Sequence, residues 1–169
     1  VEQVSWHMAA AFANELSAAD GLTECYECTG TGSSTRCDLA MDVYACEGYR
    51  LPTEAEWEFA SRAGKSTKWF FGDDGSKIGD YAWFKGNAGG KSHPVGQKKP
   101  NPWGLYDIYG NVCERISDKY ARNYYSISPE VDPTGPSQGS KSHMEYTIAA
   151  PHAGKYLLSA RVVTANYNQ

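Results

Sequence analysis

Residues 65–122 contain no sustained hydrophobic periodicity, and this feature most restricts the folds open to the chain. Gly, Pro, Asn and Asp interrupt the segment every few residues, while single large rings recur between them, among them Trp69, Trp83, Trp103 and Tyr106. These interrupting residues favour turns, whereas a random linker would not carry so many rings. The pattern predicts an ordered but irregular region in which aromatic side chains pin loops to a small sheet.

Two helices are expected before this region. The first begins after Ser5, a residue type that accepts hydrogen bonds at helix N-termini, and it ends at Gly21. Its packing face is predicted from apolar residues at helical spacing: Ala9, Phe12, Ala13 and Leu16.

The second helix has an explicit start. Thr53 and Glu56 have the Thr-x-x-Glu spacing of a capping box, in which each side chain bonds the backbone of the other residue. The packing stripe and the stop follow at Trp57, Ala60 and Gly64. Two arginines flank this helix at positions 50 and 62, and we expect them to form ion pairs with Glu56 or Glu58 rather than to take part in catalysis.

Four of the five cysteines lie close together in a segment rich in Gly, Ser and Thr: Cys25, Cys28, Cys37 and Cys46. Such a segment cannot build a core unaided, so two disulfides in an exported protein are favoured over a four-thiolate zinc site. Only one Cys-x-x-Cys pair is present, which weakens the zinc alternative. The remaining cysteine, Cys113, is expected to be a buried thiol.

The charge and hydrophobicity of the sequence restrict the classes of molecule that the protein is expected to bind. The formal net charge is −4, and the lysine pairs are expected in loops instead of on one basic face, so nucleic acid is not expected. The sequence has no apolar run long enough to cross a bilayer, so no membrane partner is expected either. A soluble chain that contacts proteins, glycans or small molecules remains.

The composition changes near the C-terminal end. Residues 129–143 are rich in Gly, Ser and Pro and are predicted to be a linker. Residues 144–169 contain two β-rich runs around a Pro-His-Ala-Gly turn, which predicts a hairpin resembling part of a β-sandwich module.

Three stretches resemble the sulfatase-modifying factor family, whose best-known member is the formylglycine-generating enzyme. They are "VEQVSWHMAAAFANELS", "YRLPTEAEWEFASRAG" and "HPVGQKKPNPWGLYDIYGNVCE", in that order from Val1 to about Tyr120. The resemblance implies an α+β, C-type-lectin-like fold with small antiparallel sheets, two helices and much irregular, calcium-stabilised chain. It identifies residues 1–128 as the central, incomplete part of such a domain.

The resemblance also implies a chemistry. Family enzymes use oxygen and a copper ion held by two cysteines to convert a cysteine of a client sulfatase to formylglycine. The segments around that cysteine pair, and the family's opening strands, do not occur in this sequence. Another difference is that Cys113, Arg115 and Lys119 stand where the family carries tryptophans, which predicts different or looser packing there.

A calcium site is implied by the same resemblance. Its ligands would be the side chain of Asp107, the backbone carbonyls of Gly110 and Val112, and the carboxylate of Glu114, a set of hard oxygens that Ca²⁺ prefers. The family's second calcium site is represented only by Asn87. The alternative is that both acids merely cap turns and stay solvated.

Two functions follow as hypotheses. The favoured one is a calcium-stabilised, non-catalytic scaffold in a secreted, periplasmic or otherwise extracellular bacterial protein, with a protein or glycan ligand. The alternative is part of a formylglycine-generating oxidase that acts on a sulfatase-type client peptide.

Overall fold

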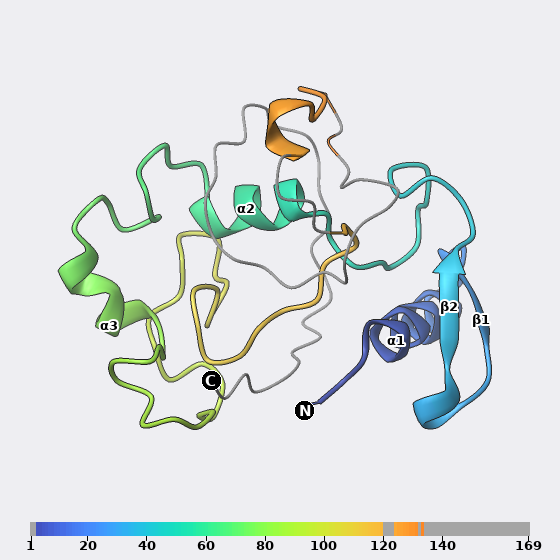
Figure 1. Cartoon of the computed structure of the whole chain (residues 1–169), viewed down its shortest axis with the longest axis horizontal. Helices are drawn as coiled ribbons and strands as arrows, with labels where there is room; N and C mark the ends of the chain where they lie inside the picture. The colour runs from blue at the N-terminus through green and yellow to red at the C-terminus, as the bar shows by residue number, and fades with distance from the viewer. Residues whose placement is uncertain (1–2, 120–123, 132, 134–169) are drawn as a thin grey trace.

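The computed structural model describes residues 3–119, 124–131 and 133. Within them the chain forms three α-helices, three short 3₁₀ helices and one antiparallel hairpin, joined by long irregular segments (Figure 1). In chain order the elements are α1 (Trp6–Ala19), β1 (Tyr26–Thr29), η1 (Gly32–Ser34), β2 (Arg36–Leu39), α2 (Glu54–Arg62), η2 (Gly75–Lys77), α3 (Ile78–Tyr81) and η3 (Tyr124–Ser126).

Helix α1 begins where the sequence predicts. The Ser5 hydroxyl accepts a hydrogen bond from the Met8 amide (3.1 Å), which satisfies one of the unpaired donors at the helix start. The buried face, however, consists of small and polar residues: Ala9, Ala10, Ala13, Asn14 and Ser17. Phe12 is 50% exposed, so its predicted place on the packing face is wrong. Small side chains let the helix approach the β1–β2 hairpin closely.

The β1–β2 hairpin is attached to α1 through Asn14. The Asn14 amide donates to the Tyr26 carbonyl (2.6 Å) and accepts from the Tyr26 amide (3.1 Å), so one side chain satisfies both backbone groups of an edge residue. Within the hairpin Cys28 lies directly opposite Cys37, and these two residues form a disulfide. The hairpin is therefore held by one covalent bond and one amide clamp.

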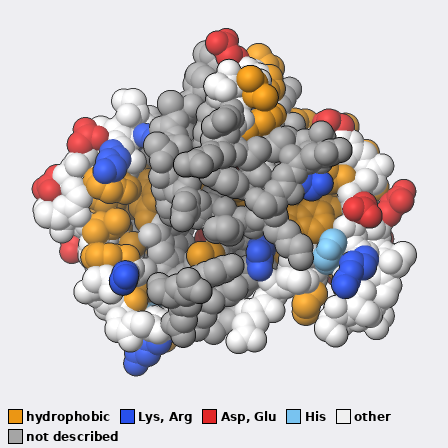
Figure 2. All heavy atoms as spheres, viewed as in Figure 1, with side chains coloured by type: hydrophobic (Ala, Val, Ile, Leu, Met, Phe, Trp, Pro, Cys, Tyr) orange, Lys and Arg blue, Asp and Glu red, His pale blue; other side chains and the backbone are white. Residues whose placement is uncertain are grey.

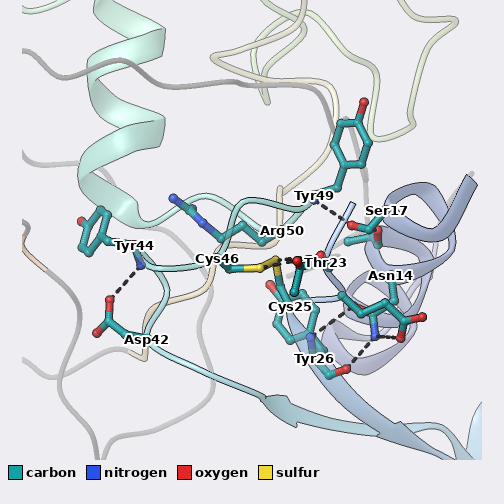
Figure 3. Close-up of a disulfide and its surroundings, with 12 residues drawn as sticks. Asn14, Ser17, Thr23, Cys25, Tyr26, Asp42, Tyr44, Cys46, Tyr49 and Arg50 are labelled. Atoms are coloured by element: carbon teal, nitrogen blue, oxygen red, sulfur yellow. Dashed lines mark hydrogen bonds between the residues drawn. A yellow bond between two sulfur atoms is a disulfide. The ribbon is translucent and has the colours of Figure 1, made fainter. Parts of the chain in front are cut away.

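A second disulfide joins Cys25 to Cys46 across 21 positions of sequence (Figure 3). The chain after Cys46 returns to α1, where the Tyr49 amide donates to the Ser17 hydroxyl (2.8 Å). Gly48 permits this approach, because a Cβ there would lie 1.8 Å from the Thr23 carbonyl oxygen. With all four of these cysteines oxidised, the disulfide prediction is confirmed and the zinc alternative is wrong.

Helix α2 follows the sequence prediction closely. The Thr53 and Glu56 side chains form the reciprocal capping box, and Arg50 makes a two-pronged ion pair with Glu56 (both N–O distances 2.7 Å). Arg62 pairs with Glu58 one turn away. The helix ends at Arg62 because Ala63 adopts a left-handed conformation (φ 48°). Both predicted ion pairs are confirmed.

The irregular region after α2 packs onto it through a second core. Buried Trp57 of α2 meets Phe70, Ile108 and Ile116, and half-buried rings surround them. The first core lies between α1 and the hairpin and contains Ala10, Ala13, Cys25, Tyr26 and Cys37. The predicted ordered, irregular, ring-rich region is thus confirmed for its described residues, but its core rings pack on α2 and not, as predicted, on a small sheet.

The α+β class with a small antiparallel sheet is confirmed, and the short helix α3 adds to the two expected helices. Among the described residues, no helix is both long and apolar enough to cross a membrane. The predicted hairpin at 144–169 and most of the predicted linker lie outside the described residues.

Candidate functional site: the 107–114 loop

The predicted calcium loop is a series of tight turns. Asp107 and Asn111 both adopt the left-handed region (φ 56° and 72°), which asparagine and aspartate tolerate better than other side chains do. The Gly110 amide donates to the Asp107 carbonyl (3.2 Å), and the Val112 amide donates to the Gly110 carbonyl (3.0 Å). The loop therefore reverses direction twice within six residues and is neither helix nor strand.

Asp107 is buried, with 7% of its surface exposed. Its Oδ2 accepts a hydrogen bond from the Gly96 amide (2.8 Å). The alternative in which this acid stays solvated is therefore wrong. A buried carboxylate is costly unless donors or cations compensate its charge, so this position suits a cation ligand in chemical type.

Glu114 lies at the other end of the loop and contacts α2. Its Oε2 accepts a hydrogen bond from the indole nitrogen of Trp57. The carboxylate is thereby oriented from the second core, and its two oxygens give it capacity for more than one contact.

Gly110 and Asn111 fix the loop against its neighbours. A Cβ on Gly110 would lie 2.1 Å from the Trp83 carbonyl oxygen, and the Asn111 amide donates to that same oxygen (2.7 Å). The Asn111 side chain also clamps His93, accepting from its amide (2.9 Å) and donating to its carbonyl (3.0 Å). The Gly110-Asn111 pair indicated a tight turn in the sequence. The sequence did not show that this turn would contact Trp83 and His93.

Asn87 has a local role in the structure. Its Oδ1 accepts from the Phe84 amide (2.7 Å), and its Nδ2 donates to the Ala82 carbonyl (3.0 Å). Both halves of the side chain thus close the turn that follows α3.

Asn101 is a residue that sequence reasoning missed. It is 3% exposed and accepts from the amides of Trp103 and Leu105 (both 3.0 Å), while its Nδ2 donates to the Ala60 carbonyl of α2 (2.7 Å). One amide thereby shapes the turn before the calcium loop and ties it to the helix. An Asn between two prolines was the available sequence signal.

Two of the residues that stand where the family carries tryptophans, Cys113 and Lys119, are exposed. Cys113 is an exposed free thiol, so the prediction that it is buried is wrong. Ile116 and Asp118 are buried instead, and Asp118 accepts from the Glu54 amide at the start of α2. A carboxylate at a helix N-terminus is favourable for the helix dipole.

The donor set can be tested against each implied metal. Two acids and backbone carbonyls are oxygen donors that fit calcium. In the described part of the chain no group of three or more His, Cys, Asp or Glu side chains could hold a metal, so such a site would depend on carbonyls. Copper, held in the family by two cysteines, does not fit the cysteines of this chain, because four are oxidised in pairs and Cys113 is a single exposed thiol.

A family model described as "Sulfatase-modifying factor enzyme 1-like domain" matches residues 1–162. The chain belongs to this family. The resemblance seen in the sequence is therefore confirmed.

Proteins similar to this sulfatase-modifying factor domain have names that indicate different functions. The domain is 35% identical over 129 residues to the formylglycine-generating enzyme of Streptomyces coelicolor, and the match covers 68% of this chain and 41% of that protein. It is 33% identical over 139 residues to chaperone protein LppX of Paenibacillus barcinonensis, covering 68% and 50%. It is 41% identical over 111 residues to serine/threonine-protein kinase pkn1 of Chlamydia pneumoniae, covering 60% and 17%.

Solved structures agree with this fold. Treponema denticola variable protein 1 superposes with a TM-score of 0.59 at 37% identity, covering 72% of this chain and 49% of that one. PvdO from Pseudomonas aeruginosa gives a TM-score of 0.53 at 25% identity, covering 83% and 44%. The domain spans half or less of the length of each of these relatives.

Proposed function

We propose that this sulfatase-modifying factor domain is a calcium-stabilised, non-catalytic scaffold that binds a protein or glycan outside the cytoplasm. The state of its cysteines carries this proposal. Four of the five are joined in two disulfides and the fifth is a lone exposed thiol, so the described chain offers no dithiol for the copper chemistry of the family's oxidases.

The disulfides also support an extracellular location. Disulfides persist in oxidising compartments and are rare where thiols are kept reduced. Both bonds brace the segment between α1 and α2, which contains only two short strands and a 3₁₀ turn.

Calcium would be held by the side chains of Asp107 and Glu114 together with the carbonyls of Gly110 and Val112. Support comes from the burial of Asp107 and from the tight turns between the two acids. When bound, the ion would supply charge compensation to a buried carboxylate and a cross-link between loop segments. The loop would then stabilise residues 93–96 as well, since Asn111 clamps His93 and Asp107 bonds Gly96.

The test measures bound metal and its effect on melting. After dialysis against metal-free buffer, elemental analysis should find calcium, and a chelator should lower Tm. Asp107→Asn should abolish both effects, whereas Asp38→Asn, which removes a matched exposed acid from β2, should leave them intact. Absence of calcium together with identical melting curves would contradict the calcium proposal.

The alternative is an oxidase domain, and several relatives are named formylglycine-generating enzyme. Its test is copper-dependent conversion of the cysteine in a Cys-x-Pro-x-Arg peptide, followed by mass spectrometry. Turnover by the wild-type chain would overturn the non-catalytic proposal, and its loss in Cys113→Ser would assign the activity to the one unpaired thiol.

A further inference from the structure

Charge is distributed very unevenly along the chain. Residues 1–64 carry eleven acids and three arginines, which gives a net charge of −8. Residues 65–99 carry seven lysines and three aspartates, a net charge of +4, and residues 100–169 are neutral. The overall charge of −4 therefore conceals a basic stretch, which includes η2 and α3.

Three lysines of this stretch gather around a single acid on α3. The pKa of Asp80 is lowered, first by its hydrogen bond to Lys99 and further by the charges of Lys99, Lys98 and Lys77. The ammonium group of Lys98 is held by the Gly79 carbonyl (2.6 Å). The charge of Lys77 also helps to lower the pKa of Asp74, after the hydrogen bonds that Asp74 accepts from Ser76. Three cations among two carboxylates leave a local excess of one positive charge.

Aromatic rings lie among these lysines in an ordered stack. The rings of Trp69 and Phe71 are parallel within 6° at 5.4 Å, and those of Phe71 and Tyr81 are parallel within 6° at 4.5 Å. Ammonium groups cover both ends of this stack. Lys68 Nζ lies 4.5 Å from the Trp69 ring and Lys99 Nζ lies 5.7 Å from the Tyr81 ring.

We call this set the basic–aromatic surface; it comprises Lys68, Trp69, Phe71, Lys77, Tyr81, Lys98 and Lys99. Figure 2 shows hydrophobic side chains beside Lys and Arg side chains on the left of the molecule, where Figure 1 places α3. The Lys99–Asp80 pair is open to water, with its side chains 64% and 59% exposed. Exposed ion pairs are weak, so an incoming anion can exchange with Asp80.

We propose that the basic–aromatic surface binds an anionic polysaccharide, a sugar chain that carries carboxylate or sulfate groups. The lysines would contact the acidic groups. When Lys68 or Lys99 moves from its ring onto such a group, the ring face it covered can pack against the apolar C–H face of a sugar ring. This inference rests on the proposed scaffold function and names the class of its ligand. Binding at the basic–aromatic surface requires no calcium.

An anionic polysaccharide explains the combination of lysines and stacked aromatic rings better than an acidic peptide does. A peptide of acidic residues needs only the charges, and a neutral polysaccharide needs only the rings. Lysines placed directly over the end rings of a flat stack suit a ligand that alternates apolar ring faces with negative groups.

The experiment uses the full chain on four immobilised polymers. Dextran sulfate and polygalacturonate present sulfate and carboxylate on sugar, while neutral dextran and polyglutamate present sugar or charge alone. We expect retention on one or both anionic polysaccharides and at least about tenfold weaker binding to the other two polymers. Equal retention on polyglutamate would assign the surface to acidic peptides and overturn the proposal, as would no retention on any polymer.

Two double variants distinguish binding at the basic–aromatic surface from a general effect of the protein's net charge. Lys77→Gln/Lys99→Gln should weaken polysaccharide binding by about tenfold, whereas Arg36→Gln/Lys119→Gln removes the same charge elsewhere and should change it less than about twofold. Equal losses in both variants would show a net-charge effect and reject the site. Binding that persists in chelator, even if no calcium is found, keeps this result distinct from the calcium test.

Discussion

Residues 3–64 and residues 65–119 are held in shape by different means. The first region contains α1, the hairpin and α2, and two disulfides brace the segment between the helices. The second has only η2 and the four-residue α3, yet its backbone is ordered by side-chain amides such as those of Asn87, Asn101 and Asn111. A chain without regular structure can satisfy its backbone groups if buried amides replace the missing ladders.

The two regions also differ in electrostatics. The acidic first region pairs two of its three arginines with buried glutamates, in Arg50–Glu56 and Arg62–Glu58. In the basic second region Lys68, Lys98 and Lys99 lie over aromatic rings, and the ion pair of this region, Lys99–Asp80, is exposed to water. The first arrangement stabilises a helix start, whereas the second leaves cations available to a ligand.

Trp57→Ala gives the largest expected effect, because this side chain belongs to the first region and fills the core of the second. It is 2% exposed and packs in the core that contains Phe70, Ile108 and Ile116. We expect a loss of about 4 kcal/mol in the free energy of unfolding, measured by urea denaturation. Trp103→Ala, at a half-exposed ring, should cost about 1 kcal/mol or less. Equal losses in the two variants would contradict the assigned core.

Removal of the Cys25–Cys46 disulfide tests the first region alone. Cys25→Ala/Cys46→Ala should cost about 3 kcal/mol, because the bond closes a long loop in the unfolded chain. Hydrogen exchange should rise in the hairpin and less in residues 101–112. Cys113→Ser, at an exposed thiol, should change stability by less than about 0.5 kcal/mol. A uniform rise in exchange across both regions would show that they do not differ in this way.

Asn101→Ala is the matching test for the second region. Two backbone amides and the Ala60 carbonyl would lose their partner, and we expect a cost of about 2 kcal/mol by urea denaturation. Asn111→Ala should affect residues 93–96 in the same way, because Asn111 bonds both backbone groups of His93. Wild-type stability in Asn101→Ala would mean that water replaces this amide without loss.

Removing calcium should affect the two regions differently in the wild-type protein. At a calcium concentration tenfold above Kd, binding stabilises the fold by about 1.4 kcal/mol. Chelation should therefore raise hydrogen exchange in residues 93–96 and 107–112 and leave β1 and β2 unchanged. An unchanged exchange pattern in both places would remove the loop's proposed role.

Tyr26→Phe gives the smallest expected effect at neutral pH, about 1 kcal/mol, because the Leu51 amide loses its acceptor. The variant also tests alkaline stability. Burial raises the pKa of Tyr26 to about 12, so the unfolded chain loses this proton first as pH rises past about 10. The wild type should lose stability between pH 10 and 12 and Tyr26→Phe should lose less. Parallel pH profiles would contradict the burial effect.

The amino-acid sequence alone determined the local features. The Ser5 cap, the capping box at Thr53 and the ion pair of Arg50 with Glu56 were all predictable, because each depends on residues within six positions of one another. The family motifs likewise identified the domain, and the absence of hydrophobic periodicity located the irregular region.

The tertiary structure alone decided which distant groups meet. Disulfide partners, the exposure of Phe12 and Cys113, the clamp of Asn111 on His93 and the stack of rings between two lysines depend on the path of the chain. Backbone preferences act over a few residues, whereas burial and pairing are fixed only when segments far apart in sequence pack together.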